Sequence, residues 1–343
     1  MKPLSNNPQH LRQLCAMLAL SQPLQPLLPV SGGFHHRMWK LQTADGFFAV
    51  KQLNPETDVH SPAVIRHYNT AESIAAAFSL QGIGAIHALQ GTVGYLQVIE
   101  HTGYLIYPWS HAKALPRGTV SASHALQVAS LLARMHQAQI QIPDIAEPSV
   151  ERLENEAIEQ LIATAGTAGV HQAKALQQAL PALLAINRVQ ADAIPLLTRH
   201  RVVSHGDLDQ KNILWQSPDK PLIIDWESAR KLNPTYEIML AALDWGGILG
   251  HFNIGIYQQV LSTYQRCGGR VESDVPEAAY HGILGEWLSW LVYNIGRAID
   301  ADAEQRQLGN SQIELVLPTL LRLKRLEKQL CSTALKPLPK NTD

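Results

Sequence analysis

The pattern of apolar and polar residues changes near residue 106. Before that point, short apolar runs such as Phe47–Val50 and Tyr104–Ile106 alternate with turns rich in glycine and proline. Apolar runs of this length between turn residues predict β-strands. Residues 71–78 are rich in alanine and have high helix propensity instead. The sequence therefore predicts a small, mainly β N-terminal region that contains one helix.

After Trp109 the pattern is typical of helices. Within residues 125–136, Val128, Leu132 and Met135 lie four and three positions apart, so they would share the buried face of one helix. Residues 151–198 are rich in alanine, leucine and glutamine, which predicts inserted helices that could form a wall of a substrate site. The predicted fold class is α+β, with a larger helical C-terminal region.

A polar segment, His205–Asn212, lies between two apolar anchors in this helical region. Val202–Val203 precede it and Ile213–Trp215 follow it. Leu222–Ile224 then form a short apolar run ending at Asp225, as expected for a buried strand that presents its last residue at a cleft. The anchors would fix the loop against a core, and a catalytic base needs such fixing to stay within hydrogen-bond reach.

The polar groups of this segment suit phosphoryl transfer. Asp207 is followed five positions later by Asn212, and Asp225 lies thirteen positions further on. An aspartate can accept the proton of an attacking hydroxyl, while an asparagine and a second aspartate can bind the Mg²⁺ that bridges nucleotide phosphates. Mg²⁺ prefers hard oxygen ligands of these two kinds. The alternative is a capping aspartate in a loop followed by an ordinary core strand, which explains neither the spacing nor the residues near position 50.

Composition adds limits to these expectations. With 343 residues, 46% of them hydrophobic and 17% charged, the chain is long enough for about two domains. A formal net charge of −1 gives no support for a nucleic-acid or membrane partner. The three cysteines have no zinc or redox spacing, which favours a reducing cytoplasm. Leu14–Leu20 is too short to span a bilayer and is expected to form a first helix. The sequence leaves the oligomeric state open.

The motifs HGDLDQKNILW and LIIDW, from His205 to Trp226, resemble the catalytic segment of the kinase superfamily. The branch they resemble contains aminoglycoside phosphotransferases and choline kinases, whose loop reads HGDxxxxN. This resemblance implies a bilobal protein-kinase-like fold. The expected divisions are an N-lobe at 1–106, a hinge at 107–111 and a C-lobe at 112–343. The resemblance also implies ATP or GTP as co-substrate, with Mg²⁺, Asp207 as base, and Asn212 and Asp225 as metal ligands.

Lys51 ends a strand-like run, FFAVK, that is similar to the VAIK strand of kinases. The resemblance implies that Lys51 binds nucleotide phosphates and that Glu72, in the alanine-rich helix, orients it. Glu56 is the competing carboxylate, but it lies between Pro55 and Thr57 in a predicted turn. For Lys51 alone, the alternative is a surface lysine at a strand end.

A turn over the phosphates is expected at Gly32 and Gly33, in a sequence similar to the SGG turn of aminoglycoside-type enzymes. Paired glycines allow backbone amides to approach phosphate oxygens closely. His35 and His36 follow the turn, and a solvated loop is the alternative interpretation for this pair.

Between the lobes, the carbonyl group of Tyr107 and the amide of Trp109 are the candidate contacts for the nucleotide base. Pro108 lies between them, stiffens the connection and lacks an N–H donor. This interpretation depends on position in the chain. An ordinary strand end is the alternative for each residue.

The predicted acceptor is a small-molecule hydroxyl. Protein kinases place an activation segment after the metal-binding aspartate and an arginine in HRD. Here Gly206 replaces that arginine, and the chain passes from Asp225 to Asn233–Glu237 with no room for such a segment. This connection is similar to the DPxxDLA sequence of small-molecule kinases. An aminoglycoside, an amino alcohol or a similar metabolite is therefore expected.

The sequence does not decide which hydroxyl is used. Glu286, Trp287, Trp290 and Asn294 lie at helical spacing, and an acid beside indole rings can hold an amine. The alternative is that the two tryptophans are core residues of a helix. From another functional class, a catalytically silent kinase-like protein that only binds nucleotide is the remaining alternative.

Overall fold

The computed structural model describes residues 8–30, 36–116, 119–143, 145 and 153–334. These residues fall into two compact units. Unit 1 lies within Met1–Arg117, Ile140–Ala146 and Val203–Arg230, and unit 2 lies within Gly118–Gln139, Glu147–Val202 and Lys231–Asp343. The short strands β7 (Val202–Ser204) and β10 (Arg230–Leu232) lie where the chain passes between the units.

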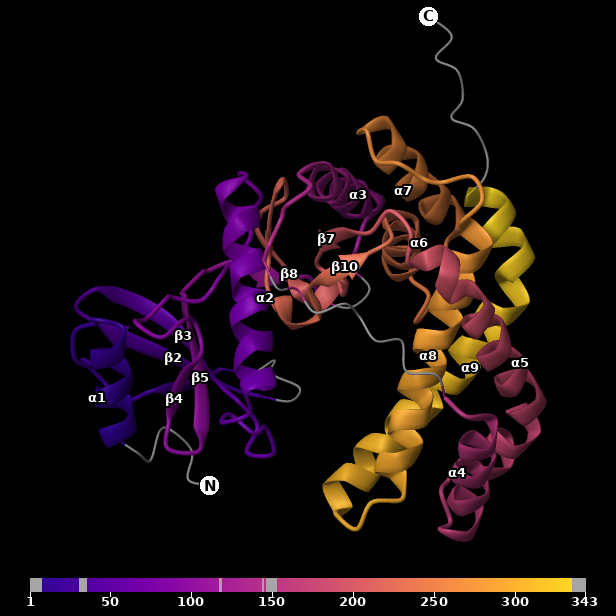
Figure 1. Cartoon of the computed structure of the whole chain (residues 1–343), viewed down its shortest axis with the longest axis horizontal. Coiled ribbons are helices and arrows are strands. Elements are labelled where there is room, and N and C mark those ends of the chain that lie inside the picture. The colour runs from indigo at the N-terminus through magenta and orange to yellow at the C-terminus, as the bar shows by residue number, and fades with distance from the viewer. Residues whose placement is uncertain (1–7, 31–35, 117–118, 144, 146–152, 335–343) are drawn as a thin grey trace, which may run out of the picture. The chain divides into compact units, whose positions relative to one another are not determined.

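Unit 1 contains a five-stranded antiparallel sheet with the order β1-β2-β3-β5-β4. Its strands are β1 (Leu28–Val30), β2 (Arg37–Thr43), β3 (Gly46–Gln52), β4 (Gln97–Ile99) and β5 (Thr102–Pro108). Helices α1 (Pro8–Met17) and α2 (Pro62–Leu80) lie on opposite sides of this sheet (Figure 1).

The alternation of side chains along the strands gives the sheet two apolar layers. Phe48 and Val50 of β3 belong to the cluster that contains Leu14 of α1. Leu105 of β5 belongs to a second cluster, which contains Tyr68 of α2. Because successive side chains of a strand point to opposite faces, Lys51 points away from the α1 layer. The strand pattern therefore directs this lysine to the α2 side of the sheet.

A second sheet carries the polar segment of the sequence. It consists of β6 (Lys113–Ala114), β8 (Ile213–Ser217) and β9 (Lys220–Ile223), in the order β6-β8-β9. The 3₁₀ turns η2 (Gln210–Asn212) and η3 (Trp226–Ser228) flank its β8–β9 hairpin. This sheet is tied to the rest of unit 1, because Ile223 accepts a backbone hydrogen bond from Ile86 and donates one to Gly84.

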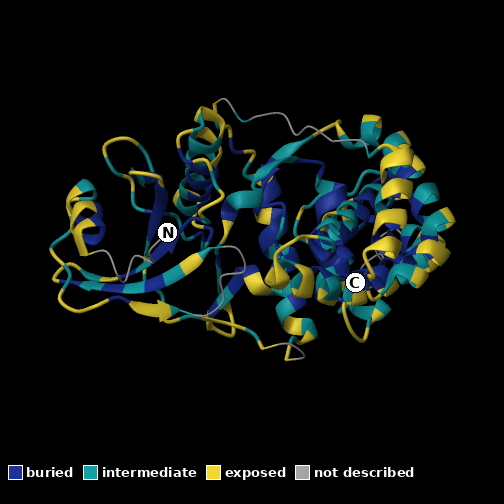
Figure 2. Ribbon diagram, turned by 90° about the horizontal axis from the view of Figure 1, so that it is seen from below, coloured by how far each residue is buried: buried dark blue, intermediate teal, exposed yellow. Residues whose placement is uncertain are grey.

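Unit 2 consists mainly of helices. Figure 2 shows these helices with exposed residues along their outer sides. They are α3 (Ala122–Gln137), α4 (Asn155–Thr167), α5 (Ala173–Leu197), α6 (Pro234–Trp245), α7 (Ile254–Arg266), α8 (Pro276–Ala298) and α9 (Ala303–Ala334).

Capping residues explain where several of these helices begin. The Ser121 side chain accepts from the His124 amide at the start of α3, and Asn233 accepts from the Thr235 amide ahead of Pro234 in α6. Such caps satisfy donors that the first turn leaves free.

Inside unit 2, a buried histidine connects three helices: His136 Nε2 donates to Glu237 Oε2 (2.8 Å), and its Nδ1 lies 2.7 Å from the hydroxyl of Tyr264. The end of α3 is thereby joined to the segment that resembles DPxxDLA.

The predicted fold class is confirmed, with a β-rich N-terminal region and a mostly helical remainder. The helix expected at 125–136 is α3, and its predicted inward residues Val128, Leu132 and Met135 are buried. The inserted helices expected within 151–198 are α4 and α5. The first helix begins earlier than predicted and ends at Met17. In the part of the chain that the structure describes, no helix is both long and apolar enough to cross a membrane.

The lobe boundaries, with a hinge at 107–111, stay a prediction. Unit 1 has different bounds because it also contains residues 203–230. Two connections explain this grouping: β6 pairs with β8, and the loop after α2 hydrogen-bonds to β9. The polar segment and the sheet with Lys51 are therefore parts of one compact unit.

Candidate active site

The polar loop of unit 1 is held by its own side chains. Asp209 accepts hydrogen bonds from the amides of Lys211 (2.9 Å) and Asn212 (3.2 Å), which caps the 3₁₀ turn. Asn212 Nδ2 donates to the Asp207 backbone oxygen (2.8 Å) and to Asp207 Oδ2 (2.9 Å). These bonds fix the Asp207 carboxylate while its side chain remains 40% exposed. A fixed carboxylate that solvent can reach meets the geometric requirement for a general base.

His205 connects this loop to the strand that leads to Asp225. It is fully buried and packs against Trp226 with ring centroids 4.7 Å apart. Its Nε2 lies 3.0 Å from the Ile224 carbonyl oxygen, and its Nδ1 accepts from the Asp207 amide at 3.2 Å. Since a carbonyl group only accepts, Nε2 must carry the hydrogen. His205 therefore positions Asp207 through the main chain.

Gly206 has a backbone conformation that favours glycine. Its φ is +79°, and a Cβ atom at this position would lie 2.5 Å from the Ser228 carbonyl oxygen. Such a distance is far below normal contact, so a side chain here would push the backbone away. This explains physically why glycine occupies the place of the arginine in HRD.

Asp225 lies just after β9, directly before η3, and has a left-handed conformation with φ +63° and ψ +64°. This conformation is uncommon for residues other than glycine and is found frequently at functional sites. The amide of Ile224 donates to the Asn212 backbone oxygen (3.0 Å), and Ile213 pairs with Ile223. The β8–β9 hairpin thus brings the two predicted metal ligands, Asn212 and Asp225, to the same end of the sheet.

Lys51 reaches this end of the sheet from β3. Its Nζ donates to Asp225 Oδ1 at 2.9 Å and also to Glu227 Oε1. Burial opposes the charge on Lys51, but Glu227 and Asp225 together raise its pKa above the ordinary value. Asp225 and Lys51 were both predicted as site residues, and the structure brings them into direct contact. Lys51 is not a surface lysine, because its side chain is only 10% exposed.

The expected contact between Lys51 and Glu72 is not formed. Instead, Glu72 Oε1 accepts from the hydroxyl of Tyr107 (2.7 Å), and Oε2 accepts from the amide of Ala88 (2.6 Å). Burial raises the pKa of Glu72, against the effect of these two hydrogen bonds and the weaker effect of Lys51. In this structure Asp225 and Glu227 hold the lysine instead, so the pairing of Lys51 with Glu72 stays a prediction. Glu56, the competitor, donates a turn hydrogen bond from its amide to the Asn54 side-chain oxygen (3.1 Å).

Glu227 and His36 extend the charged cluster around Lys51. His36 Nδ1 accepts from the Asn54 amide (3.1 Å), so Nε2 is the nitrogen that donates to Glu227 Oε2 at 3.4 Å. Burial alone would raise the pKa of Glu227, but the His36 hydrogen bond and the Lys51 charge lower it to about 2. His36 is therefore engaged in this cluster and not in a solvated loop. Gly32, Gly33 and His35 lie outside the described residues.

The predicted base contacts at Tyr107 and Trp109 do not fit the register of the sheet. The Trp109 amide donates to the Phe47 carbonyl oxygen at 3.0 Å. Tyr107 lies opposite Ala49, two positions along the same antiparallel ladder. Hydrogen-bonded pairs recur every second residue in such a ladder, so the Tyr107 carbonyl group also faces β3. The prediction for these two groups is wrong because the sheet already uses them.

The neighbouring backbone groups point away from β3. Among the described contacts, neither the Pro108 carbonyl oxygen nor the Ser110 amide has a hydrogen-bond partner, and both residues border a cavity of about 300 Å³. The lining residues of this cavity are Ser79, Ala85, Ile86, His87, Pro108, Trp109, Ser110 and Leu222. The available donor and acceptor are therefore displaced by one residue from the predicted ones.

Comparison with known proteins identifies the family. A model of the phosphotransferase enzyme family matches residues 26–269. The chain belongs to this phosphotransferase family. The match covers the predicted phosphate turn, Lys51 and the whole polar loop. A comparison with curated protein sequences gave no match.

Solved structures show that this phosphotransferase has a protein-kinase-like fold. It is similar to a spectinomycin phosphotransferase in complex with ADP and spectinomycin, at 13% identity and a TM-score of 0.67, covering 93% of this chain and 98% of that chain. An amicoumacin kinase in complex with AMP-PNP and Ca²⁺ matches at 13% identity and a TM-score of 0.63, with 98% and 97% covered. A Plasmodium vivax ethanolamine kinase matches at 13% identity and a TM-score of 0.56, with 89% and 83% covered.

Three functional groups of this phosphotransferase were missed in the sequence: Glu227, the ring of His205, and Lys211. Lys211 Nζ lies 3.3 Å from Asp207 Oδ2 and 2.9 Å from Asp209 Oδ2. Its position four residues after Asp207 was a usable signal, since such pairs meet in a helical turn. Glu227 had a weaker signal, namely a second carboxylate two positions after Asp225.

The residues considered for an amine site lie on α8 of unit 2. Asn294 is buried, and its Nδ2 donates to the Trp290 backbone oxygen (2.8 Å). Glu286 is exposed and accepts from the hydroxyl of Tyr236, while both tryptophans are partly buried. Asn294 is therefore a buried residue of α8. For Glu286, Trp287 and Trp290, the choice between an amine site and a structural role stays open.

Proposed function

We propose that this phosphotransferase is a small-molecule kinase, which transfers the γ-phosphoryl group of ATP or GTP to a hydroxyl group. The observation that carries the proposal is the joint placement of four groups. Asp207 is fixed by Asn212, and Asp225 is paired with Lys51 at the same end of one sheet. Phosphoryl transfer needs a base, metal ligands and a phosphate-binding cation in this kind of proximity.

Asp207 is proposed as the general base. Its carboxylate would accept the proton of the acceptor hydroxyl as the hydroxyl oxygen bonds to the γ-phosphorus. The bond from that phosphorus to the bridging β–γ oxygen breaks, and the nucleoside diphosphate leaves with the bond's electron pair. Asn212 and Lys211 would hold the carboxylate in place during this step.

Asn212 and Asp225 are proposed as ligands for Mg²⁺. The donor set fits, because it consists of an amide oxygen and carboxylate oxygens. Asn212 uses only Nδ2 in the described contacts, and Asp225 uses only Oδ1. One oxygen of each side chain is thus left for a cation. Bound there, Mg²⁺ would neutralise charge on the nucleotide phosphates.

Lys51 is proposed to bind the phosphates, which requires it to leave at least one of its two carboxylate partners. Glu72 is proposed as its partner in the nucleotide-bound state. The charge of Lys51 already counteracts part of the burial effect on the Glu72 pKa, and the Glu72 carboxylate is held by the hydroxyl of Tyr107. The amides of Gly32 and Gly33 are proposed to cover the phosphates.

We propose the segment from Pro108 to Ser110 as the contact for the nucleotide base. The Pro108 carbonyl oxygen would accept from the base and the Ser110 amide would donate to it. In this proposal, the backbone groups of Tyr107 and Trp109 pair with β3 and hold the segment in place, and Trp109 also lines the cavity. Ser110 Oγ has a separate role, since it accepts from the Ala112 amide at 3.1 Å.

Replacing Ser110 by proline is expected to weaken nucleotide binding roughly two- to tenfold, because the substitution removes one donor of a hydrogen bond. Isothermal titration with nucleotide measures the change. Ser110→Ala is the matched control, since it keeps the backbone amide and removes only Oγ. Equal binding by both variants, with unchanged melting temperatures, would show that the Ser110 amide does not contact the base.

The acceptor is proposed to be an aminoglycoside, an amino alcohol or a similar metabolite. The similar structures include proteins named for spectinomycin and ethanolamine, which are small molecules with hydroxyl groups. The proposal does not include nucleic acid or a membrane as partner. A cytoplasmic location is also proposed, and the three cysteines are all free.

Release of ADP or GDP in the presence of candidate acceptors tests the proposed function. The panel would contain aminoglycosides, choline, ethanolamine and homoserine, each with ATP and with GTP. We expect release that depends on one class of acceptor and yields a phosphorylated product. Nucleotide binding without release with any acceptor would favour the alternative, a catalytically silent nucleotide-binding protein.

A further inference from the structure

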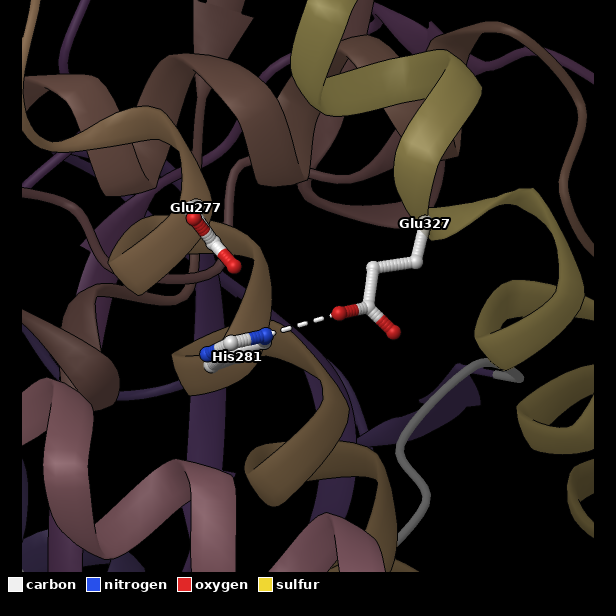
Figure 3. A group of neighbouring side chains, drawn as sticks. All are labelled: Glu277, His281 and Glu327. Atoms are coloured by element: carbon white, nitrogen blue, oxygen red, sulfur yellow. Dashed lines mark hydrogen bonds and ion pairs between the residues drawn. The ribbon is translucent and has the colours of Figure 1, made fainter.

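A group of side chains of the types that can bind metals lies in unit 2, outside the proposed kinase site. Glu277 and His281 are four positions apart on α8, so they occupy one face of this helix. Glu327 comes from α9 and lies opposite them (Figure 3). One ligand atom from each of the three residues lies within 4.8 Å of the others. The two helices thus bring one imidazole and two carboxylates together.

The backbone that carries these side chains is fixed. α8 and α9 run side by side (Figure 1). At the level of the cluster, the buried hydroxyl of Tyr280 donates to the Leu323 carbonyl oxygen at 2.8 Å. Leu323 and Leu330, on either side of Glu327 in the sequence, are fully buried. A ligand group on helices that are packed in this way needs only side-chain rotation to adjust.

His281 and Glu327 already share a contact of suitable geometry. His281 Nε2 lies 2.8 Å from Glu327 Oε1, and their side chains are 13% and 18% exposed. Ligands at about 2.0–2.1 Å from a tetrahedral Zn²⁺ lie roughly 3.3 Å apart. The pair therefore has to widen by only about half an ångström for an ion to replace the shared hydrogen.

Glu277 supplies the third ligand. Figure 3 shows its carboxylate beside the His281 ring, with one oxygen directed toward the ring. Within the described part of the chain, this carboxylate has no hydrogen bond or ion pair. Glu327, in contrast, also binds Lys324 Nζ through Oε2 at 2.5 Å. This lysine offsets part of the negative charge and leaves Oε1 as the oxygen that faces the site.

We propose that Glu277, His281 and Glu327 form a site for a divalent cation of the zinc type, which links α8 to α9. An imidazole nitrogen beside carboxylate oxygens suits Zn²⁺ and similar transition metals, whereas Mg²⁺ prefers oxygen ligands alone. The site is therefore chemically distinct from the proposed magnesium site of the kinase reaction. Three protein ligands leave at least one position for water.

Zinc titration of the full-length protein tests this site without reference to kinase activity. Metal-free protein would be titrated calorimetrically in excess Mg²⁺, so that the magnesium ligands are occupied. We expect one Zn²⁺ per chain and a rise in melting temperature. Glu277→Gln and His281→Ala should each lower zinc affinity by roughly tenfold or more, the scale on which metal sites respond to changes around the ion.

His171→Ala is the matched control. His171 pairs with Glu314 of α9 at 3.7 Å, but among the residues that the structure describes this exposed pair has no third ligand. Its replacement should leave zinc affinity unchanged. Glu277→Gln guards against a folding artefact, because Glu277 is exposed and makes no described contact that folding requires. Failure of the parent to bind zinc, equal affinity in Glu277→Gln, or a similar loss in His171→Ala would overturn the proposal.

Discussion

Replacing Asp207 by asparagine is expected to slow phosphoryl transfer by about two orders of magnitude or more, the usual scale for loss of a general base. Asparagine keeps the shape of the side chain and can still contact Asn212, but it cannot take the proton of the acceptor. The measurement is the steady-state kcat with saturating nucleotide and acceptor.

Asp219→Asn is the control for this experiment. Asp219 undergoes the same chemical change in the turn between β8 and β9, where it accepts a hydrogen bond from Ser217 (2.7 Å). Its variant should retain the parent kcat. If Asp207→Asn also retained it, the assignment of Asp207 as base would be wrong.

Replacing Lys51 by methionine should reduce kcat/KM for the nucleotide roughly tenfold to hundredfold. This range corresponds to the loss of a hydrogen bond between charged groups, about 1.5–3 kcal/mol. Methionine keeps the unbranched shape of the stem, so the β3 strand is expected to form. The measurement compares kcat/KM of the variant and the parent at fixed Mg²⁺.

The structure also predicts a loss of stability in Lys51→Met. From the sequence alone, a lysine at a cleft would contribute little to folding. In the structure, however, Lys51 is buried and lies between Asp225 and Glu227, so its removal leaves two neighbouring carboxylates without their cation. We expect a lower melting temperature. Lys220→Met, at an exposed position on β9, should change neither activity nor stability. Unchanged kcat/KM in Lys51→Met would contradict the proposed phosphate contact.

Local chemistry was predictable from the sequence, because it depends on neighbouring residues. The roles proposed for Asp207 and Asn212 follow from their spacing within one short loop, and the placement of Asp225 follows from an apolar run that ends at a polar residue. The helix at 125–136 was equally clear, since its apolar positions repeat at the helical period. Each of these features lies within one short segment.

The partner of Lys51 was not predictable in the same way. Its two carboxylates lie 174 and 176 positions away in the sequence, and their approach depends on how β9 is packed within unit 1. Glu72 was a reasonable candidate by resemblance, but the hydroxyl of Tyr107 occupies one of its oxygens. Long-range choices between similar carboxylates are decided by packing, which the residue pattern does not contain.

The contacts at Tyr107 and Trp109 were mispredicted because of a one-residue ambiguity. In an antiparallel ladder, alternate residues direct their backbone groups to the neighbouring strand and away from it. If this alternation is shifted by one residue, the backbone groups that faced the neighbouring strand face away from it, and the others face toward it. The sequence locates the end of β5 but does not fix this alternation, which becomes visible only when Trp109 is seen to donate to Phe47.

Nucleotide titrations of Asp207→Asn and Asp225→Asn, each with and without Mg²⁺, test the central assignment of roles most directly. Asp207→Asn should keep the magnesium-dependent gain in nucleotide affinity, because the proposed metal ligands are intact. Asp225→Asn should lose most of that gain, because it removes a negative charge from the proposed metal site. The opposite result, with magnesium dependence lost in Asp207→Asn and retained in Asp225→Asn, would contradict the proposed kinase mechanism.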